Sequence, residues 1–372
     1  MQKHRITAFF LFIAAIAIII AVAPIYRSMH ADDYIKKGPG VTETKMLSDY
    51  FPGLKGTPGD TVIYVFDSGV PGGTVYMTGG THANEPSGII TAALFVENVK
   101  ITKGRLFVTV HANASSATHT DYTEGSPQFF HLETPGGVRT FRYGSRATSP
   151  THQWPDPDVY VHASSGQQLS GSEVRNLNRA HPGRPDGTLT EKMAFAIAEM
   201  IRREKVGMAI DLHEASPEYP VINAIVAHER AMDVAAEAAM DLEMEGINFR
   251  LEPSPVNLRG LSHREWGDHT DTLAILMESA NPAQGRIRGK TDERLIVTGE
   301  DDMYLRVEPL GKLFVPFDEN GHPLSQRVAR HATAINALVR VYSSHYPESA
   351  VEMEGLPDYE TICTDMNAYL IP

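Results

Sequence analysis

The amino-acid sequence predicts an α/β fold in which helices cover both faces of a mixed, mostly parallel sheet, preceded by one transmembrane helix. Short apolar, β-branched runs alternate with helix patterns through most of the chain, and this alternation is typical of a sheet covered on both sides. The chain has 372 residues, 42% of them hydrophobic, so it can bury a large core. An uncharged apolar stretch precedes the alternating part and predicts the transmembrane helix.

The first segment, residues 1–27, is expected to be a signal anchor. Ile6 to Ala23 is a run of about 18 uncharged residues, which can just span a bilayer and exceeds the roughly 7–15 residue core of a cleaved signal. Basic residues precede the run and acidic residues follow it soon after, which places the body outside the cytoplasm. The alternative is a signal peptide cleaved after residues 21–23. Both interpretations export the body, and the first makes the membrane a partner.

The elements of the body follow in order. Residues 28–60 are rich in Gly, Pro and charge and are expected to form a tether and a loop leading into the body. Apolar runs predict strands at Thr61–Phe66, Thr74–Thr78, Arg105–His111, Val206–Leu212, Val221–Val226 and Leu273–Met277. Helix patterns lie at Pro86–Asn98, Leu189–Glu204, Glu229–Glu245 and Leu324–Tyr342. The main domain is therefore expected at 61–346, with a C-terminal extension at 347–372.

One long stretch, Ala112 to Arg175, does not follow this alternation. It is rich in Ser, Thr, Gly and Pro, but it also carries aromatic residues such as Phe141, Trp154 and Tyr160, which argue against disorder. A loop of this length inside a compact domain is usually functional. We therefore expect this stretch to form the wall or the lid of a pocket.

Composition excludes several classes of protein. Asp and Glu outnumber Lys and Arg by 46 to 33, which gives a net charge of −13. Proteins that bind nucleic acid gain affinity by neutralising phosphates, so nucleic acid is not expected as a partner. The single cysteine, Cys363, excludes an intrachain disulfide and cysteine-based metal sites. Any metal ion must therefore be held by histidines and carboxylates.

Two of the predicted strands end in side chains that could bind such an ion. In open α/β sheets, ligands bind at the carboxyl ends of the strands. The strand at 74–78 leads into a glycine-rich turn with His82 and Glu85 three residues apart, and the strand at 206–212 leads into His213. Two imidazoles and one carboxylate suffice for catalytic zinc, which keeps its fourth position open. We expect these three residues to hold one zinc ion.

Glu278, at the end of a third apolar strand, is the candidate for proton transfer. Amide hydrolysis needs a group that takes a proton from water and passes it to the leaving nitrogen. A carboxylate presented by a buried strand is costly unless it is compensated, and such a group often marks a functional site. We therefore predict that Glu278 acts as the general base and acid.

The segment Arg175–Gly183 contains a candidate binding site for a carboxylate. In it, Asn178 stands next to Arg179. A guanidinium fork beside an amide matches a planar carboxylate with paired hydrogen bonds, where a lysine would offer only a point charge. We expect the segment to bind a substrate that has a free carboxylate.

Four motifs together resemble the succinylglutamate desuccinylase/aspartoacylase family, within the wider zinc carboxypeptidase superfamily. In chain order they are Gly-Gly-Thr-His-Ala-Asn-Glu-Pro, Asn-Leu-Asn-Arg-Ala-His-Pro-Gly, Asp-Leu-His and a late strand glutamate, spread over residues 61–282. The resemblance implies a three-layer α/β/α sandwich of the zinc carboxypeptidase type. Two departures stand out, since the family usually has glycine at the position of Ala83 and an acid at the position of Asn176.

Carried over by position, the resemblance implies a role for each candidate residue. His82, Glu85 and His213 would be the zinc ligands, Glu278 the general base and acid, and Asn178 with Arg179 the carboxylate site. The superfamily also uses an upstream arginine to stabilise the oxyanion. The candidates for that role are Arg139, Arg142, Arg146 and Arg175, of which we favour Arg146.

These inferences predict a zinc-dependent hydrolase that cleaves an amide bond next to a free carboxylate, as in the deacylation of N-acyl amino acids. An exported zinc carboxypeptidase that acts on peptides or cell-wall fragments is the first alternative. A membrane-tethered binding protein with the same fold and no catalysis is the second. The sequence does not predict the acyl group, the preferred amino acid or the oligomeric state.

Overall fold

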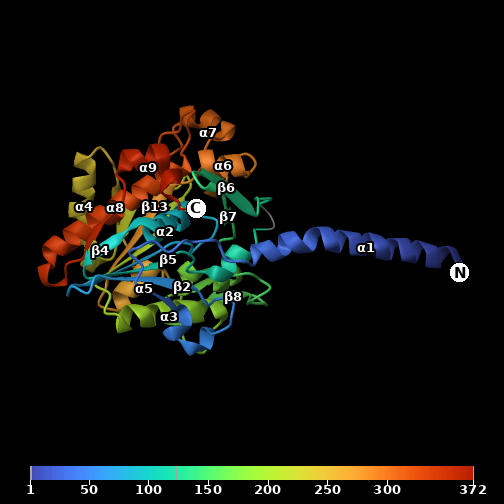
Figure 1. Cartoon of the computed structure of the whole chain (residues 1–372), viewed down its shortest axis with the longest axis horizontal. Coiled ribbons are helices and arrows are strands. Elements are labelled where there is room, and N and C mark those ends of the chain that lie inside the picture. The colour runs from blue at the N-terminus through green and yellow to red at the C-terminus, as the bar shows by residue number, and fades with distance from the viewer. Residues whose placement is uncertain (1, 122–123, 372) are drawn as a thin grey trace.

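A computed structural model describes residues 2–121 and 124–371, and within them eight strands form one central sheet (Figure 1). Four of the strand pairings in this sheet are parallel and three are antiparallel, so the predicted mixed, mostly parallel sheet is confirmed. From one edge to the other the strands are β1 (Glu43–Met46), β2 (Val62–Asp67), β5 (Arg105–Thr109), β3 (Thr74–Thr78), β10 (Met208–Ala215), β13 (Leu273–Ala280), β11 (Ala224–Ala227) and β12 (Arg250–Pro253).

Helices cover both faces of the sheet, as predicted. One face carries α2 (Pro86–Asn98), α4 (Met232–Met244) and α8 (Leu324–His345), and the other carries α3 (Leu189–Arg203) and α5 (Ser262–His269) (Figure 1). Successive side chains of a strand point to opposite faces. Met77 and Ile210 accordingly belong to the first core, whereas their neighbours Tyr76 and Ala209 belong to the second. The three-layer α/β/α sandwich is therefore confirmed.

The central strands β5, β3, β10 and β13 run parallel, and this places the candidate residues together at the carboxyl ends of these strands. Thr78, the last residue of β3, is paired with Asp211 of β10. Two residues further along β10, His213 is paired with Glu278 of β13. Chain segments far apart in sequence therefore present polar side chains at the same end of the sheet.

Helix α1 (Gln2–Met29) projects from the body (Figure 1). Its residues Lys3–Met29 are long and apolar enough to cross a membrane, and the most apolar part of the helix is not buried against the body. A cleaved signal sequence has the same length and composition, so this finding fits both interpretations of the N-terminal segment.

Several elements, most of them short, were not predicted. Residues 28–60 contribute the edge strand β1, whose sequence Glu-Thr-Lys-Met has one apolar residue. The stretch 112–175 contains two hairpins, and residues 347–371 include a short strand and a helix that pack against the body. The remaining elements are β4 (Lys100–Lys103), β6 (Phe129–Thr134), β7 (Gly137–Arg142), β8 (Val159–Val161), β9 (Gln168–Ser170), α6 (Glu293–Thr298), α7 (Asp302–Val307), β14 (Glu352–Glu354) and α9 (Tyr359–Asp365).

A buried ion pair joins α8 to the strand that carries His213. Arg327 Nη1 lies 2.6 Å from Glu214 Oε1, and both side chains are almost completely buried. Removing one partner of such a pair leaves an uncompensated charge in the core. We expect Arg327→Met to lower the free energy of unfolding by about 3–5 kcal/mol, as measured by urea denaturation.

An exposed ion pair on the same helix provides the control. Arg340 Nη2 lies 3.1 Å from Asp241 Oδ2, and the Arg340 side chain is 59% exposed. Exposed pairs contribute roughly 0–1 kcal/mol, so Arg340→Met should have little effect on the unfolding midpoint. Equal losses in the two variants would contradict the role assigned to Arg327.

Candidate active site

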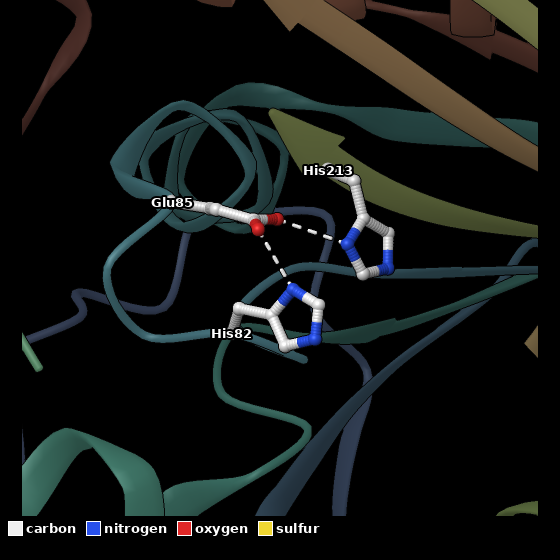
Figure 2. A group of neighbouring side chains, drawn as sticks. All are labelled: His82, Glu85 and His213. Atoms are coloured by element: carbon white, nitrogen blue, oxygen red, sulfur yellow. Dashed lines mark hydrogen bonds and ion pairs between the residues drawn. The ribbon is translucent and has the colours of Figure 1, made fainter. Parts of the chain in front are cut away.

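His82 and Glu85 lie in the turn between β3 and α2, and the backbone of this turn requires glycine. Gly80 has a φ of +63°, a conformation that residues other than glycine rarely adopt. A Cβ at Gly79 would lie 2.2 Å from the carbonyl oxygen of Gly88, so α2 packs directly on the turn. The turn brings His82 Nδ1 to 2.7 Å from Glu85 Oε1 (Figure 2).

His213 reaches the same carboxylate from β10. Its Nδ1 lies 2.9 Å from Glu85 Oε2, so each oxygen of Glu85 faces one imidazole (Figure 2). One ligand atom from each of the three residues lies within 4.8 Å of the other two, and all three side chains are buried. Two nitrogens and a carboxylate in this arrangement fit a divalent ion such as zinc. The structure thus brings the three predicted ligands together.

Each imidazole is also oriented by a second polar side chain. His82 Nε2 lies 2.9 Å from Oδ1 of Asn176, and His213 Nε2 lies 2.9 Å from Oδ2 of Asp211. Asp211 is itself held by Thr81, whose hydroxyl donates to Oδ1 at 2.8 Å. Metal-ligating histidines almost always have such outer partners, which fix the tautomer and the ring orientation. The Nδ1 atoms of both rings are therefore the ones presented to an ion.

The charges around the two imidazoles differ. Burial, assisted by Arg146, lowers the pKa of His82 to about 4, so this ring is neutral. Burial also acts against protonation of His213, but the carboxylates of Asp211 and Glu85 outweigh it and hold its pKa well above the ordinary value. Those imidazoles in turn hold the pKa of Glu85 below its ordinary value despite the burial. Because a histidine must be neutral to bind a metal, an ion at this site would compete with protons for His213.

Glu278 lines the same cavity, which has a volume of 840 Å³. Within the described residues, its Oε2 is buried and has no hydrogen-bond partner. Burial raises the pKa of its carboxyl, an effect that His213 opposes and Glu85 reinforces. A cation held at His82, Glu85 and His213 would favour the ionised form again. A carboxyl whose charge depends on its surroundings in this way suits proton transfer near neutral pH.

Of the four arginines considered for the oxyanion, the structure places Arg146 in the cavity. Its Nη1 lies 3.7 Å from Glu85 Oε1, and its side chain is 44% exposed. The other three have carboxylate partners elsewhere: Arg139 pairs with Glu97, Arg142 with Asp33, and Arg175 with Asp156. The role of Arg146 remains a prediction, now supported by its position.

Asn178 and Arg179 also line the cavity. Asn178 Oδ1 accepts a hydrogen bond from the backbone N–H of Ser262 at 2.8 Å, which fixes the amide. Arg179 Nη1 donates to the carbonyl oxygen of Asn178 at 2.6 Å, which holds the guanidinium beside that amide. The predicted carboxylate site is therefore formed by neighbouring, ordered groups, and its role remains a prediction.

The wall of the cavity differs from what the sequence predicts. Among the residues of 112–121 and 124–175, which the structure describes, only Arg146 lines the cavity, and the aromatic residue Phe141 is buried in the core instead. Most of the wall comes from the segments 214–221 and 252–263. Phe130, Phe141 and Tyr143 belong to the core on the face covered by α2 and α8, so they stabilise the hairpin that β6 and β7 form.

Sequence reasoning did not assign roles to three residues of the site. Asn176 and Asp211 orient the two imidazoles, and each is the first residue of one of the recognised motifs. His263 begins α5 and faces the cavity, and within the described residues neither of its ring nitrogens has a hydrogen-bond partner. Burial lowers the pKa of His263 to about 3, so it presents a neutral imidazole. Its place before the Glu278 strand was the only signal in the sequence.

Comparisons with known proteins give matches among solved structures. No family model matches the chain, and no curated protein matches it in sequence. Matching structures include a succinylglutamate desuccinylase from Silicibacter sp. TM1040, with 16% identity and a TM-score of 0.41 over 80% of this chain. An aspartoacylase family protein from Mesorhizobium loti has 17% identity and a TM-score of 0.35 over 59% of this chain. A metallo-carboxypeptidase from Burkholderia cenocepacia has 9% identity and a TM-score of 0.44 over 80% of this chain.

These matched proteins include the family that the sequence motifs resemble. This chain covers 64% of the length of the desuccinylase, 55% of the aspartoacylase family protein and 68% of the metallo-carboxypeptidase. Structural similarity at this level does not establish an activity, so the evidence for function comes from the residues of the site.

Proposed function

We propose that this chain is a zinc-dependent hydrolase that cleaves an amide bond next to a free carboxylate, as in the deacylation of N-acyl amino acids. The observation that carries the proposal is that His82, Glu85 and His213 converge in the cavity that Glu278 also lines. A donor set suited to zinc and a carboxyl available for proton transfer in one cavity are the two components that metal-assisted hydrolysis needs.

In the proposed mechanism, the residues of the chain act on the substrate in distinct ways. A zinc ion held by His82, Glu85 and His213 would polarise the amide carbonyl and make water a better nucleophile. Glu278 takes the proton that the attacking water loses and delivers it to the leaving nitrogen. Arg146 donates hydrogen bonds to the oxyanion of the tetrahedral intermediate. Asn178 and Arg179 hold the free carboxylate, which sets the distance from that group to the scissile bond.

The purified full-length chain tests this proposal directly. Elemental analysis should find one zinc ion per chain, and a panel of N-acyl amino acids should be hydrolysed with release of the free amine. Esterified substrates that lack the carboxylate should be hydrolysed much more slowly. A protein that contains zinc but leaves the whole panel and a peptide panel intact would support the alternative of a binding protein.

A carboxypeptidase remains the second candidate. The 840 Å³ of the cavity lies in the upper part of the roughly 300–1,000 Å³ usual for small-molecule sites, which leaves room for the end of a short peptide. Release of single amino acids from the carboxyl end of short peptides, measured beside the deacylation assay, separates the two activities.

We expect His263 to influence which substrate side chain is accepted. Its neutral imidazole lines the cavity, as do apolar residues such as Leu261 and Leu276. A hydrogen bond from it to a polar substrate side chain is worth about 1 kcal/mol, or roughly fivefold to tenfold in kcat/KM. His263→Leu should lower kcat/KM by this factor for substrates with polar side chains and leave aliphatic substrates unaffected. Zinc content should stay unchanged, and equal losses for both substrate classes would contradict the prediction.

We also propose that α1 anchors the body in a membrane. The support is the length and apolar composition of Lys3–Met29. Detergent-dependent extraction of the intact chain, with its N-terminus identified by mass spectrometry, distinguishes an anchor from a cleaved signal.

A further inference from the structure

An exposed tryptophan lies close to the point where α1 meets the body. The chain has two tryptophans. Trp266 is 1% exposed in the core between α5 and the sheet, whereas Trp154 is 72% exposed. A side chain this large and apolar gains free energy when it is covered, and tryptophan is enriched where membranes meet water. The position of Trp154 relative to α1 therefore decides what could cover it.

No flexible tether separates α1 from the body. Met29, the last residue of the helix, is 3% exposed, and its carbonyl oxygen accepts a hydrogen bond from Arg142. Four residues later, the buried carboxylate of Asp33 contacts His111 Nε2 at 2.7 Å and Arg142 Nε at 2.9 Å. These contacts hold the end of the helix against the hairpin of β6 and β7.

The body consequently begins where the helix becomes polar. The apolar part of α1 runs to Tyr26, and Arg27 is the first charged residue after it. Met29 is two residues further on, or about 3 Å along the helix axis. The headgroup layer on each side of a bilayer is about 5–7 Å thick. If α1 spans the membrane, the part of the body around Met29 lies at the level of the headgroups.

Trp154 belongs to this part of the body. The ring of His30, just after α1, lies 6.1 Å from the ring of His152. Trp154 is two residues beyond His152, so their Cα atoms are at most about 7 Å apart. Strand β8 follows, and in Figure 1 it is drawn on the same side of the body as the base of α1. Its side chains Val159 and Val161 are exposed on one face of the strand, while Tyr160 between them is buried.

We propose that Trp154, together with Val159 and Val161, contacts the lipid bilayer that α1 crosses, at the depth of the headgroups. We take the lipid as the partner of these three side chains, because a bilayer crossed by α1 would lie next to them. Asp156, two residues after Trp154, is paired with Arg175 at 2.7 Å. The chain carries a net charge of −13, so attraction to acidic lipid headgroups is not expected to drive the contact. We therefore expect the contact to be apolar and insensitive to salt. This contact would hold the cavity in a fixed orientation above the membrane. The proposal rests on the anchor role of α1 and not on the hydrolase activity.

Tryptophan fluorescence of the full-length chain in lipid nanodiscs tests the contact. The difference between the wild-type and Trp154→Phe spectra isolates the emission of Trp154 from that of Trp266. Lipids brominated near the top of their acyl chains should reduce this emission by roughly half or more, because tryptophan at the interface lies within reach of them. The aqueous quencher iodide should have less effect on it than on a tryptophan in water.

A matched control places the same fluorophore elsewhere. Met244 is 81% exposed at the end of α4, on the side of the body away from α1 (Figure 1). In a Trp154→Phe background, Met244→Trp should be quenched by iodide and not by the brominated lipid. The proposal is overturned if the emission of Trp154 behaves like that of this control, or if the mature chain lacks α1. Because Trp154 is exposed, Trp154→Phe should leave folding and hydrolytic activity unchanged, so the result does not depend on the proposed function.

Discussion

Replacing Glu278 with glutamine is expected to lower kcat by roughly 10²–10⁴-fold while the chain keeps its zinc. Glutamine fills the same space but can neither accept the proton of the attacking water nor donate one to the leaving nitrogen. Glu278 is not one of the three groups that converge at the candidate metal site, so its charge is not needed to complete the donor set. Zinc content by elemental analysis and kcat at saturating substrate are the two measurements.

Another carboxylate of the same cavity provides the matched control. Glu252 on β12 also lines the cavity but lies at the far edge of the sheet. Glu252→Gln should retain most of the activity, with at most a modest change in KM. Full activity in Glu278→Gln would remove Glu278 from the mechanism. Equal losses in the two variants would point to the overall charge of the cavity rather than to proton transfer by one residue.

The central strands were predicted well because a strand that is buried on both faces has a continuous run of apolar residues in its sequence. Thr74–Thr78 and Pro86–Asn98 have the same bounds in the structure as in the prediction. The edge strand β1 has no such apolar run in its sequence. Strand β1 pairs with β2 through its backbone, and three of its four side chains are exposed, so hydrogen bonding and not hydrophobic pattern determines it.

The candidate site was predictable to the extent that each of its residues comes soon after an apolar run in the sequence. His82, Glu85 and His213 could be proposed together because parallel strands deliver their carboxyl ends to one edge. Their outer partners could not be predicted in this way. Asn176 reaches His82 across 94 residues of sequence from an irregular segment, and such a contact depends on the course of a loop. Its amide stands where the resembled family usually has an acid, so Nε2 of His82 faces a neutral amide, whereas Nε2 of His213 faces the carboxylate of Asp211.

The wall of the cavity was also not predictable from the sequence. The stretch 112–175 was expected to form its wall because of its length and its aromatic residues, but Phe130, Phe141 and Tyr143 belong to the core and Trp154 is exposed. Phe130 and Phe141 stack with ring centroids 5.6 Å apart and are completely buried. Aromatic side chains in a long loop therefore indicate order, and they do not by themselves indicate which surface the loop faces.

Removing one ligand should abolish zinc binding and activity together. In His82→Ala, two ligands remain, and we expect the affinity for zinc to fall by more than the roughly 10–100-fold that the loss of an outer partner costs. The variant should therefore be purified without zinc and without measurable turnover. Added zinc should raise the melting temperature of the metal-free wild-type chain by mass action but not that of the variant. This thermal shift reports on binding independently of catalysis.

His345 provides the control for this change, because it repeats the same sequence spacing. His345 and Glu348 form a second His-x-x-Glu pair, but His345 is partly exposed and its Nε2 lies 2.7 Å from Glu237 on α4. His345→Ala should keep one zinc ion and full activity. Retention of zinc in His82→Ala would place the ion elsewhere and would contradict the proposed hydrolase site. Loss of zinc in both variants would show that folding, and not ligation, had been lost. The comparison therefore tests whether the turn after β3, rather than the motif alone, creates the metal site.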